Sequence, residues 1–254
     1  MQTRELTGRR GRQAAAPVSS GPAYVTRKIP YYAFLDEEAL SRIEDQAFHL
    51  LETVGIEFRE APDALARWRQ AGAEVNGTRV RADRGLVRSL LASAPAEFEQ
   101  RARNPARSVR IGGPHQVFAP VYGSPFVRDL EGGRHYGTLA DFERLVRLTH
   151  QLAPLHHSGF VTCEPCDVPV SKRHLDMLLA HMTLTDKPHL GAITEKSRAQ
   201  DSVAMARLLH GDAVVDQHCV IMGNVNTNSP LLVDKVVTDA ADVYCGAGQG
   251  LIVV

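Results

Sequence analysis

The chain has 254 residues, and its 29 Lys and Arg residues are balanced by 29 Asp and Glu residues. A neutral chain has no overall field that would draw it to nucleic acid or to an anionic membrane. Its apolar stretches are shorter than the roughly 20 residues of a membrane-spanning helix, and four cysteines are too few to staple a secreted scaffold. We therefore expect a cytoplasmic protein that contacts neither nucleic acid nor membrane.

The N-terminal part of the sequence predicts a tail followed by helices. Residues 1–26 are rich in Arg, Ala, Gly and Ser and lack an apolar period, which is typical of a disordered tail. Helical spacing of apolar residues, with capping residues or glycine at the ends, then predicts three helices over residues 36–55, 62–72 and about 83–92.

Residues 97–138 change to a period of two, which predicts antiparallel strands. The clearest pair is a hairpin in which the turn Glu131-Gly132-Gly133 joins Phe126–Leu130 to Arg134–Thr138. Together with the helices, these strands define an expected N-terminal subdomain over residues 27–138.

Strands and helices alternate after residue 138, where Thr138 and Asp141 resemble a capping box. Such alternation is typical of βαβ units and of a parallel sheet covered on both faces. The last helix is expected to begin at Pro230, with Ser229 as its cap. Apolar strands are predicted over residues 158–163, 189–194, 219–224 and 249–254, and helices over 171–182, 197–209 and 230–244.

The expected architecture is an α/β (β/α)8 TIM-type barrel, of which residues 139–254 supply about the first four strands. A barrel needs eight strand and helix units, and the sequence stops within an apolar strand. We therefore predict an incomplete barrel. A complete open sheet of four strands is the alternative.

Polar side chains follow the predicted parallel strands. Glu164 and Asp167 come after the first strand, Glu195 after the second, and Asn224 and Asn226 lie at the end of the third. Because barrel chemistry takes place at the carboxyl ends of the strands, these five residues are candidates for a binding site. Glu164 and Glu195 are equally well explained as solvated loop carboxylates.

Cys163 and Cys166 have the CxxC spacing of redox and zinc sites. No second pair completes four ligands, and the residues that follow do not open a helix, so we interpret both as structural thiols and expect no metal site. The sequence also has no phosphate loop, dinucleotide glycine signature or nucleophile elbow. This absence argues against nucleotide chemistry and serine hydrolysis.

A set of short motifs in a fixed order resembles the trimethylamine methyltransferase family. The similarity runs from about Tyr31 to the end of the sequence. The motifs that carry it are Gly123-Ser124-Pro125, Val127-Arg128-Asp129, Arg134 to Thr138 with Asp141, Asp167-Val168-Pro169, Thr185 to Pro188, and Asn228 to Leu231.

The resemblance implies a longer (β/α)8 barrel enzyme that moves a methyl group from a methylated amine to the cobalt of a separate corrinoid protein. No cofactor would then be bound by this chain, and the full-length protein is expected to be a homo-oligomer. The methyl donor is trimethylamine in members that carry pyrrolysine, and glycine betaine or another quaternary amine in members without it. The pyrrolysine region would follow residue 254, so the donor stays open.

A quaternary ammonium favours carboxylates and aromatic faces. Glu164, Asp167 and Glu195 are therefore candidate partners of the cation, and Asn224 and Asn226 would orient a substrate carboxylate or the incoming corrinoid. Tyr122, Phe126 and Tyr136 would add aromatic surface if the hairpin folds over the barrel mouth, or would form the small core of the hairpin. No residue is assigned as catalytic. A protein that binds methylated amines without turnover, and an inactive fragment of the enzyme, are the alternatives.

Overall fold

The structure is a computed structural model that describes residues 21–254. Residues 1–20 of the predicted tail lie outside the described residues. The remainder of that tail is not entirely irregular, because it contains the short strand β1 (Val25–Thr26), which pairs antiparallel with β7 (His115–Gln116).

The three N-terminal helices form close to the predicted positions. Asp36 and Asp83 cap α1 and α3 by accepting hydrogen bonds from Ala39 N and Leu86 N, and Gly72 ends α2 in the left-handed region with a φ of 98°. Three strands between the helices were not predicted, because three residues are too short to show a period of two. The elements are α1 (Glu37–Thr53), β2 (Ile56–Phe58), α2 (Pro62–Ala71), β3 (Glu74–Asn76), β4 (Arg79–Arg81) and α3 (Arg84–Ala92).

The predicted antiparallel strands are confirmed, but they form two separate sheets. One sheet has the order β1-β7-β6-β5, and the hairpin of β8 and β9 stands apart from it. Asp129 accepts a hydrogen bond from Glu131 N and so stabilises the predicted hairpin turn. The bounds are β5 (Glu97–Gln100), β6 (Val109–Gly112), β8 (Phe126–Asp129) and β9 (Gly133–Tyr136), with a short 3-10 helix at Pro105–Arg107.

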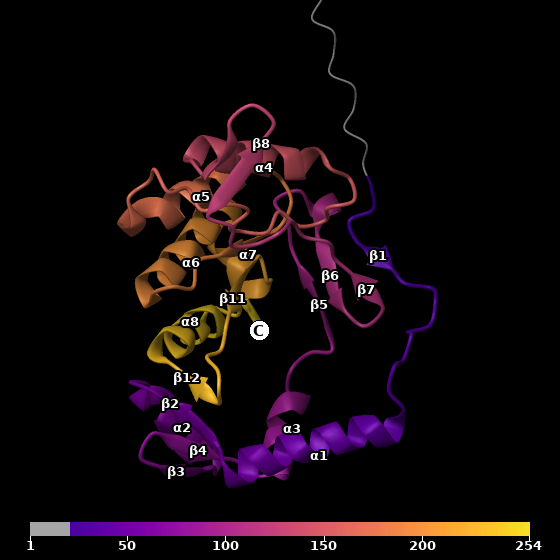
Figure 1. Ribbon diagram of the computed structural model, residues 1–254, viewed down its shortest axis with the longest axis vertical. Coiled ribbons are helices and arrows are strands. Elements are labelled where there is room, and N and C mark those ends of the chain that lie inside the picture. Colours follow the sequence, from indigo (N-terminus) through magenta and orange to yellow (C-terminus); the bar gives the residue numbers. More distant parts are fainter. Residues whose placement is uncertain (1–20) are drawn as a thin grey trace, which may run out of the picture.

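The second half of the chain contains a parallel sheet of three strands in the order β10-β11-β13. Figure 1 shows α5, α6 and α8 arranged along one side of these strands. The capping box of Thr138 and Asp141 is confirmed at the start of α4. The bounds are α4 (Leu139–Gln151), α5 (Val170–Leu184), β10 (His189–Gly191), α6 (Lys196–His210), α7 (Asp212–Gln217), β11 (Ile221–Val225), β12 (Leu232–Val233), α8 (Lys235–Gly246) and β13 (Gly250–Val253).

The predicted strand over residues 158–163 is wrong as a regular strand. The segment lies beside β10, because Ser158 N donates to Pro188 O at 2.9 Å and Leu190 N donates to Gly159 O at 3.0 Å. Gly159 has a φ of +71°, which is incompatible with extended backbone and interrupts the pairing.

The predicted helix start at Pro230 is also wrong, and Ser229 is not its cap. The helix α8 begins at Lys235, and Asp234 caps it by accepting from Val237 N. Leu232 and Val233 instead form β12, which pairs in parallel with β2 at Glu57 and Phe58. This pairing links the two halves of the chain, so the division into domains at residue 138 stays a prediction.

The main hydrophobic core lies between the parallel strands and their helices, and includes Phe142, Leu178, Ile221 and Tyr244. The hydroxyl of Tyr244 donates to Ala192 O at 2.9 Å. A Cβ atom on Gly191 would lie 2.2 Å from that hydroxyl, so glycine is needed there for the ring to pack.

Buried amides close the amino ends of the parallel strands. Gln100 is fully buried and donates to the carbonyls of His189 and Val220, while Gln249 accepts from the backbone N–H groups of Val220 and Ile221. Residues 21–254 form a mixed α/β structure without a closed barrel, and none of their helices combines the length and apolar character that a membrane crossing requires.

Candidate functional site

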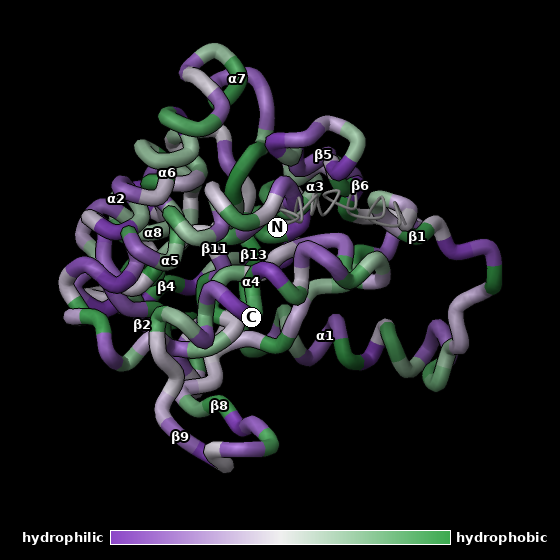
Figure 2. The backbone as a smooth tube through the Cα atoms, turned by 90° about the horizontal axis from the view of Figure 1, so that it is seen from above, coloured by the Kyte–Doolittle hydropathy of each residue, from purple (hydrophilic) through white to green (hydrophobic). Residues whose placement is uncertain are grey.

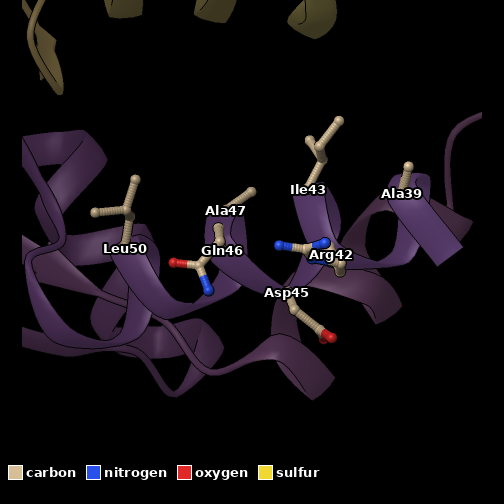
Figure 3. Close-up of a pocket in the computed structure, with 7 residues that line it drawn as sticks. All are labelled: Ala39, Arg42, Ile43, Asp45, Gln46, Ala47 and Leu50. Carbon is tan, nitrogen blue, oxygen red and sulfur yellow. The ribbon is translucent and has the colours of Figure 1, made fainter. Parts of the chain in front are cut away.

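A shallow hollow of about 750 Å³ lies on the surface of α1. Figure 3 shows Ile43, Ala47 and Leu50 on one side of the helix and Asp45 pointing the other way. In Figure 2, α1 lies at the side of the molecule and alternates between hydrophilic and hydrophobic residues. All seven lining residues come from this one helix, so no polar groups from different elements converge there as a binding site requires.

A smaller cavity of about 250 Å³ lies at the carboxyl ends of the parallel strands. Its walls come from the loop before the hairpin, the segment beside β10, the starts of α5 and α6, and the end of β11. It brings together four of the eight predicted site residues. The lining residues are Tyr122, Gly123, Phe160, Val161, Glu164, Val170, Arg173, His174, Met177, Ala192, Ile193, Thr194, Arg198, Asn224 and Asn226.

Backbone hydrogen bonds place Tyr122 beside Glu164. Gly123 N donates to Val161 O at 2.7 Å, and Glu164 N donates to Ser124 O at 2.8 Å, so the two segments run side by side. Although the residue Tyr122 as a whole is 42% exposed, burial and then the charge of Glu164 raise the pKa of its hydroxyl, a direction we attribute to the part of the side chain that lines the cavity. The phenol therefore stays protonated at neutral pH and can donate a hydrogen bond into the cavity.

Arg173, in the first turn of α5, forms an ion pair with Glu164 at 2.5 Å. The same guanidinium donates two further hydrogen bonds to Val168 O, at 3.2 and 3.0 Å. Arg173 is therefore held in place by three bonds, and it fixes the Glu164 carboxylate at the cavity wall.

The start of α6 supplies a second arginine. Arg198 donates to Thr194 Oγ1 at 3.1 Å and to Glu195 Oε1 at 3.0 Å. The Arg198 side chain is only 16% exposed, whereas that of Glu195 is 57% exposed and does not line the cavity. Glu195 therefore reaches the site only through Arg198.

Two buried polar atoms in the cavity wall have no hydrogen-bond partner within residues 21–254. They are Nδ1 of His174 and Oδ1 of Asn224. The other ring nitrogen of His174 is 2.7 Å from Asp201 Oδ2, which fixes the ring. Buried polar atoms are nearly always paired, so a polar molecule is expected between these walls.

Three other predicted residues lie outside the cavity. Asp167 accepts from Leu139 N at 2.8 Å and so supports the start of α4. Phe126 and Tyr136 pack against each other in the hairpin with ring centroids 4.6 Å apart and the rings tilted by 35°, and the Arg134 guanidinium lies over the Phe126 ring. Their position fits the hairpin-core interpretation, and Tyr122 is the aromatic residue of that predicted group that lines the cavity.

The sequence-based reasoning missed Arg173, His174 and Arg198. Arg173 and Arg198 lie in the first turns of helices that follow the strand ends, and His174 comes directly after Arg173. In parallel α/β folds these helix starts lie at the same edge as the carboxyl ends of the strands, so their polar residues could have been included.

The cysteines do not join the cavity. Burial raises the pKa of Cys163, and that of Cys219, to about 11, so both are protonated thiols at neutral pH. Across residues 21–254 no cluster of His, Cys, Asp or Glu has an arrangement that would hold a metal ion.

Comparison with known proteins confirms the resemblance seen in the sequence. Residues 3–254 match the family described as trimethylamine methyltransferase (MTTB). The chain is also 39% identical over 226 residues to a protein named glycine betaine methyltransferase from Desulfitobacterium hafniense (strain Y51). The match covers 89% of this chain and 47% of that relative, so the chain spans about half the relative's length. The chain belongs to the trimethylamine methyltransferase family.

Proposed function

We propose that the protein with this sequence is a methyltransferase that moves a methyl group from a methylated amine to a corrinoid carried by a separate protein. The family match over residues 3–254 carries this proposal. The similarity to a protein named glycine betaine methyltransferase supports a quaternary amine as the methyl donor.

The arrangement of the parallel strands supports the first part of a (β/α)8 barrel. Strands β10, β11 and β13 follow each other in chain order, and the segment at residues 158–163 lies beside β10 in the place of a first strand. Barrels place their active sites at the carboxyl ends of such strands, which is where the 250 Å³ cavity lies.

The cavity walls suit a small methylated cation. Glu164 supplies a negative charge, and Tyr122 and Phe160 supply aromatic faces that attract a quaternary ammonium. A quaternary ammonium leaves as a neutral amine and needs no added proton, so the task of these residues is binding and positioning.

The corrinoid would supply cobalt(I) as the nucleophile that takes up the methyl group. A cavity of about 250 Å³ is below the range typical of drug-sized ligands and is too small for a corrinoid ring. This size supports a corrinoid carried by a partner that approaches the cavity mouth. We also propose a cytoplasmic location and a homo-oligomeric full-length protein.

Methyl transfer can be measured directly. The protein is mixed with a reduced corrinoid protein and glycine betaine, and dimethylglycine is quantified by mass spectrometry, with trimethylamine as the second donor. Formation of the demethylated amine, dependent on both proteins, is the expected result. Binding of the amine without any demethylation would instead support the binding-protein alternative.

A further inference from the structure

The two arginines of the cavity differ in how firmly they are held by the protein. Arg173 has three bonds, to Glu164 and to Val168 O, and all are to groups in or next to the cavity wall. Arg198 pairs with Glu195, a carboxylate that is 57% exposed. Ion pairs with exposed carboxylates contribute little free energy, so Arg198 can exchange Glu195 for a carboxylate on a ligand.

The backbone at Arg198 also favours an anion. The helix α6 has 15 residues, and the side chain of Glu195 at its N-cap position accepts no hydrogen bond from the backbone N–H groups of the first turn. The N–H groups of that turn therefore have no side-chain cap, and the positive end of the helix dipole lies at this edge of the cavity.

A second observation in the same cavity also points to a polar ligand. His174 is 6% exposed and lines the cavity, and within residues 21–254 its Nδ1 has no hydrogen-bond partner. Asp201 binds the other nitrogen. Because Asp201 occupies Nε2, Nδ1 is the ring nitrogen that remains to bond a polar group in the cavity.

We propose that Arg198 binds a carboxylate on the methylated amine and so makes the cavity selective for amino-acid betaines over amines without a carboxylate. Glu164, Tyr122 and Phe160 remain for the trimethylammonium end of such a zwitterion. This inference rests on the proposed function, and it reassigns Glu195 from a partner of the cation to a competitor of the substrate carboxylate.

Binding measured by isothermal titration calorimetry tests the role of Arg198 without requiring turnover. Glycine betaine is compared with tetramethylammonium, which has the same cationic group and no carboxylate. The substitution Arg198→Met is expected to weaken glycine betaine binding about 10- to 100-fold, the range for a lost charge-assisted hydrogen bond, and to leave tetramethylammonium binding unchanged. Arg207→Met is the matched control, because Arg207 lies on the same helix but pairs with Asp212 and Asp216 away from the cavity.

The variant Glu195→Gln separates the two roles of Glu195. Removing the competing carboxylate frees Arg198, so glycine betaine is expected to bind more tightly, whereas loss of a cation partner would weaken its binding. Arg198→Lys keeps the charge and is expected to recover part of the affinity. Thermal unfolding of each variant checks that the fold is retained.

The outcomes distinguish this inference from the proposed function. If Arg198→Met weakens the binding of both ligands equally, or if Glu195→Gln weakens the binding of glycine betaine, the proposed role of Arg198 is overturned. Neither result would affect the proposed methyl transfer. If the unaltered protein binds neither ligand and transfers no methyl group, both proposals are overturned. A loss confined to glycine betaine, together with tighter binding in Glu195→Gln, supports the inference.

Discussion

Glu164 is the residue on which the proposed cation site depends. Its carboxylate forms an ion pair with Arg173, and its charge contributes to the raised pKa of Tyr122. The side chain is 36% exposed, so its ion pair contributes only modestly to stability. We therefore expect the Glu164 charge to contribute more free energy to ligand binding than to folding.

Glu164→Gln removes the charge and keeps the shape of the side chain. We expect about tenfold weaker binding of tetramethylammonium, since a nearby charge acting on a desolvated cation contributes about 1.4 kcal/mol or more. The pKa of Tyr122 should fall, although burial will keep it above its usual value. Calorimetry and ultraviolet titration of the phenol measure the two effects. An unchanged affinity for tetramethylammonium would show that Glu164 only forms the ion pair with Arg173 and does not bind the cation.

At the scale of elements, Lys187 joins the end of α4 to the loop before β10. The side chain is 3% exposed, and its Nζ donates to the carbonyls of Thr149, Leu152 and Leu155 at 2.6, 2.9 and 2.6 Å. These carbonyls belong to the last turn of α4 and the residues after it, beyond the regular helical hydrogen bonds, and among them Leu152 O also accepts from Leu155 N at 3.2 Å. Lys187 therefore acts as a side-chain cap from a distant segment.

Lys187→Met should lower the free energy of unfolding by about 3 kcal/mol, because one buried and two partly buried carbonyls lose a charged donor at a cost of about 1–3 kcal/mol each. Urea denaturation measures this change. Lys172→Met is the control, since Lys172 is 58% exposed and pairs with Asp176 on the same helix. Equal effects of the two substitutions would contradict the capping role.

At the scale of the whole molecule, three buried histidines connect the segment at residues 157–158, α5 and β10. His157 contacts Gln100 Oε1 at 3.1 Å, His181 contacts Ser158 Oγ at 2.8 Å, and the rings of His181 and His189 stack with centroids 5.3 Å apart. Burial lowers the pKa of His157 and of His181 to about 3 and that of His189 to about 4.

These shifts predict a loss of stability in mild acid. The unfolded histidines take up protons below a pKa of about 6.5, whereas the folded ones do so only near pH 3 to 4. Between these values the unfolded state binds more protons, so stability falls as the pH decreases, by up to about 1.4 kcal/mol per pH unit for each histidine. Denaturation in urea between about pH 7 and pH 5 measures the slope.

His157→Gln should reduce the slope of stability against pH by the contribution of one histidine. Glutamine can keep a polar contact to Gln100, and it does not titrate. His49→Gln is the control, since His49 lies on the exposed helix α1. A slope unchanged in His157→Gln would show that other groups cause the acid sensitivity.

Element boundaries were predicted well wherever neighbouring residues decide them. The caps at Asp36, Asp83 and Thr138 and the hairpin turn at Asp129 act within three residues of the chain. The start of α8 was predicted wrongly, because Pro230 is a good first-turn residue but Leu232 pairs with Glu57 in a distant strand. A local signal was overruled there by a tertiary contact.

The sequence by itself determined the α/β class, the parallel strands after residue 138, the family, and the polar strand ends that include Glu164 and Asn224. Such features depend on periodicity and on short motifs, which are written in adjacent residues. Only the tertiary structure decided that Arg198 and His174 join them around one cavity, and that Asp167 and the hairpin aromatics do not. Residues far apart in the chain come together there through tertiary packing. Their spacing in the sequence does not predict which residues they contact.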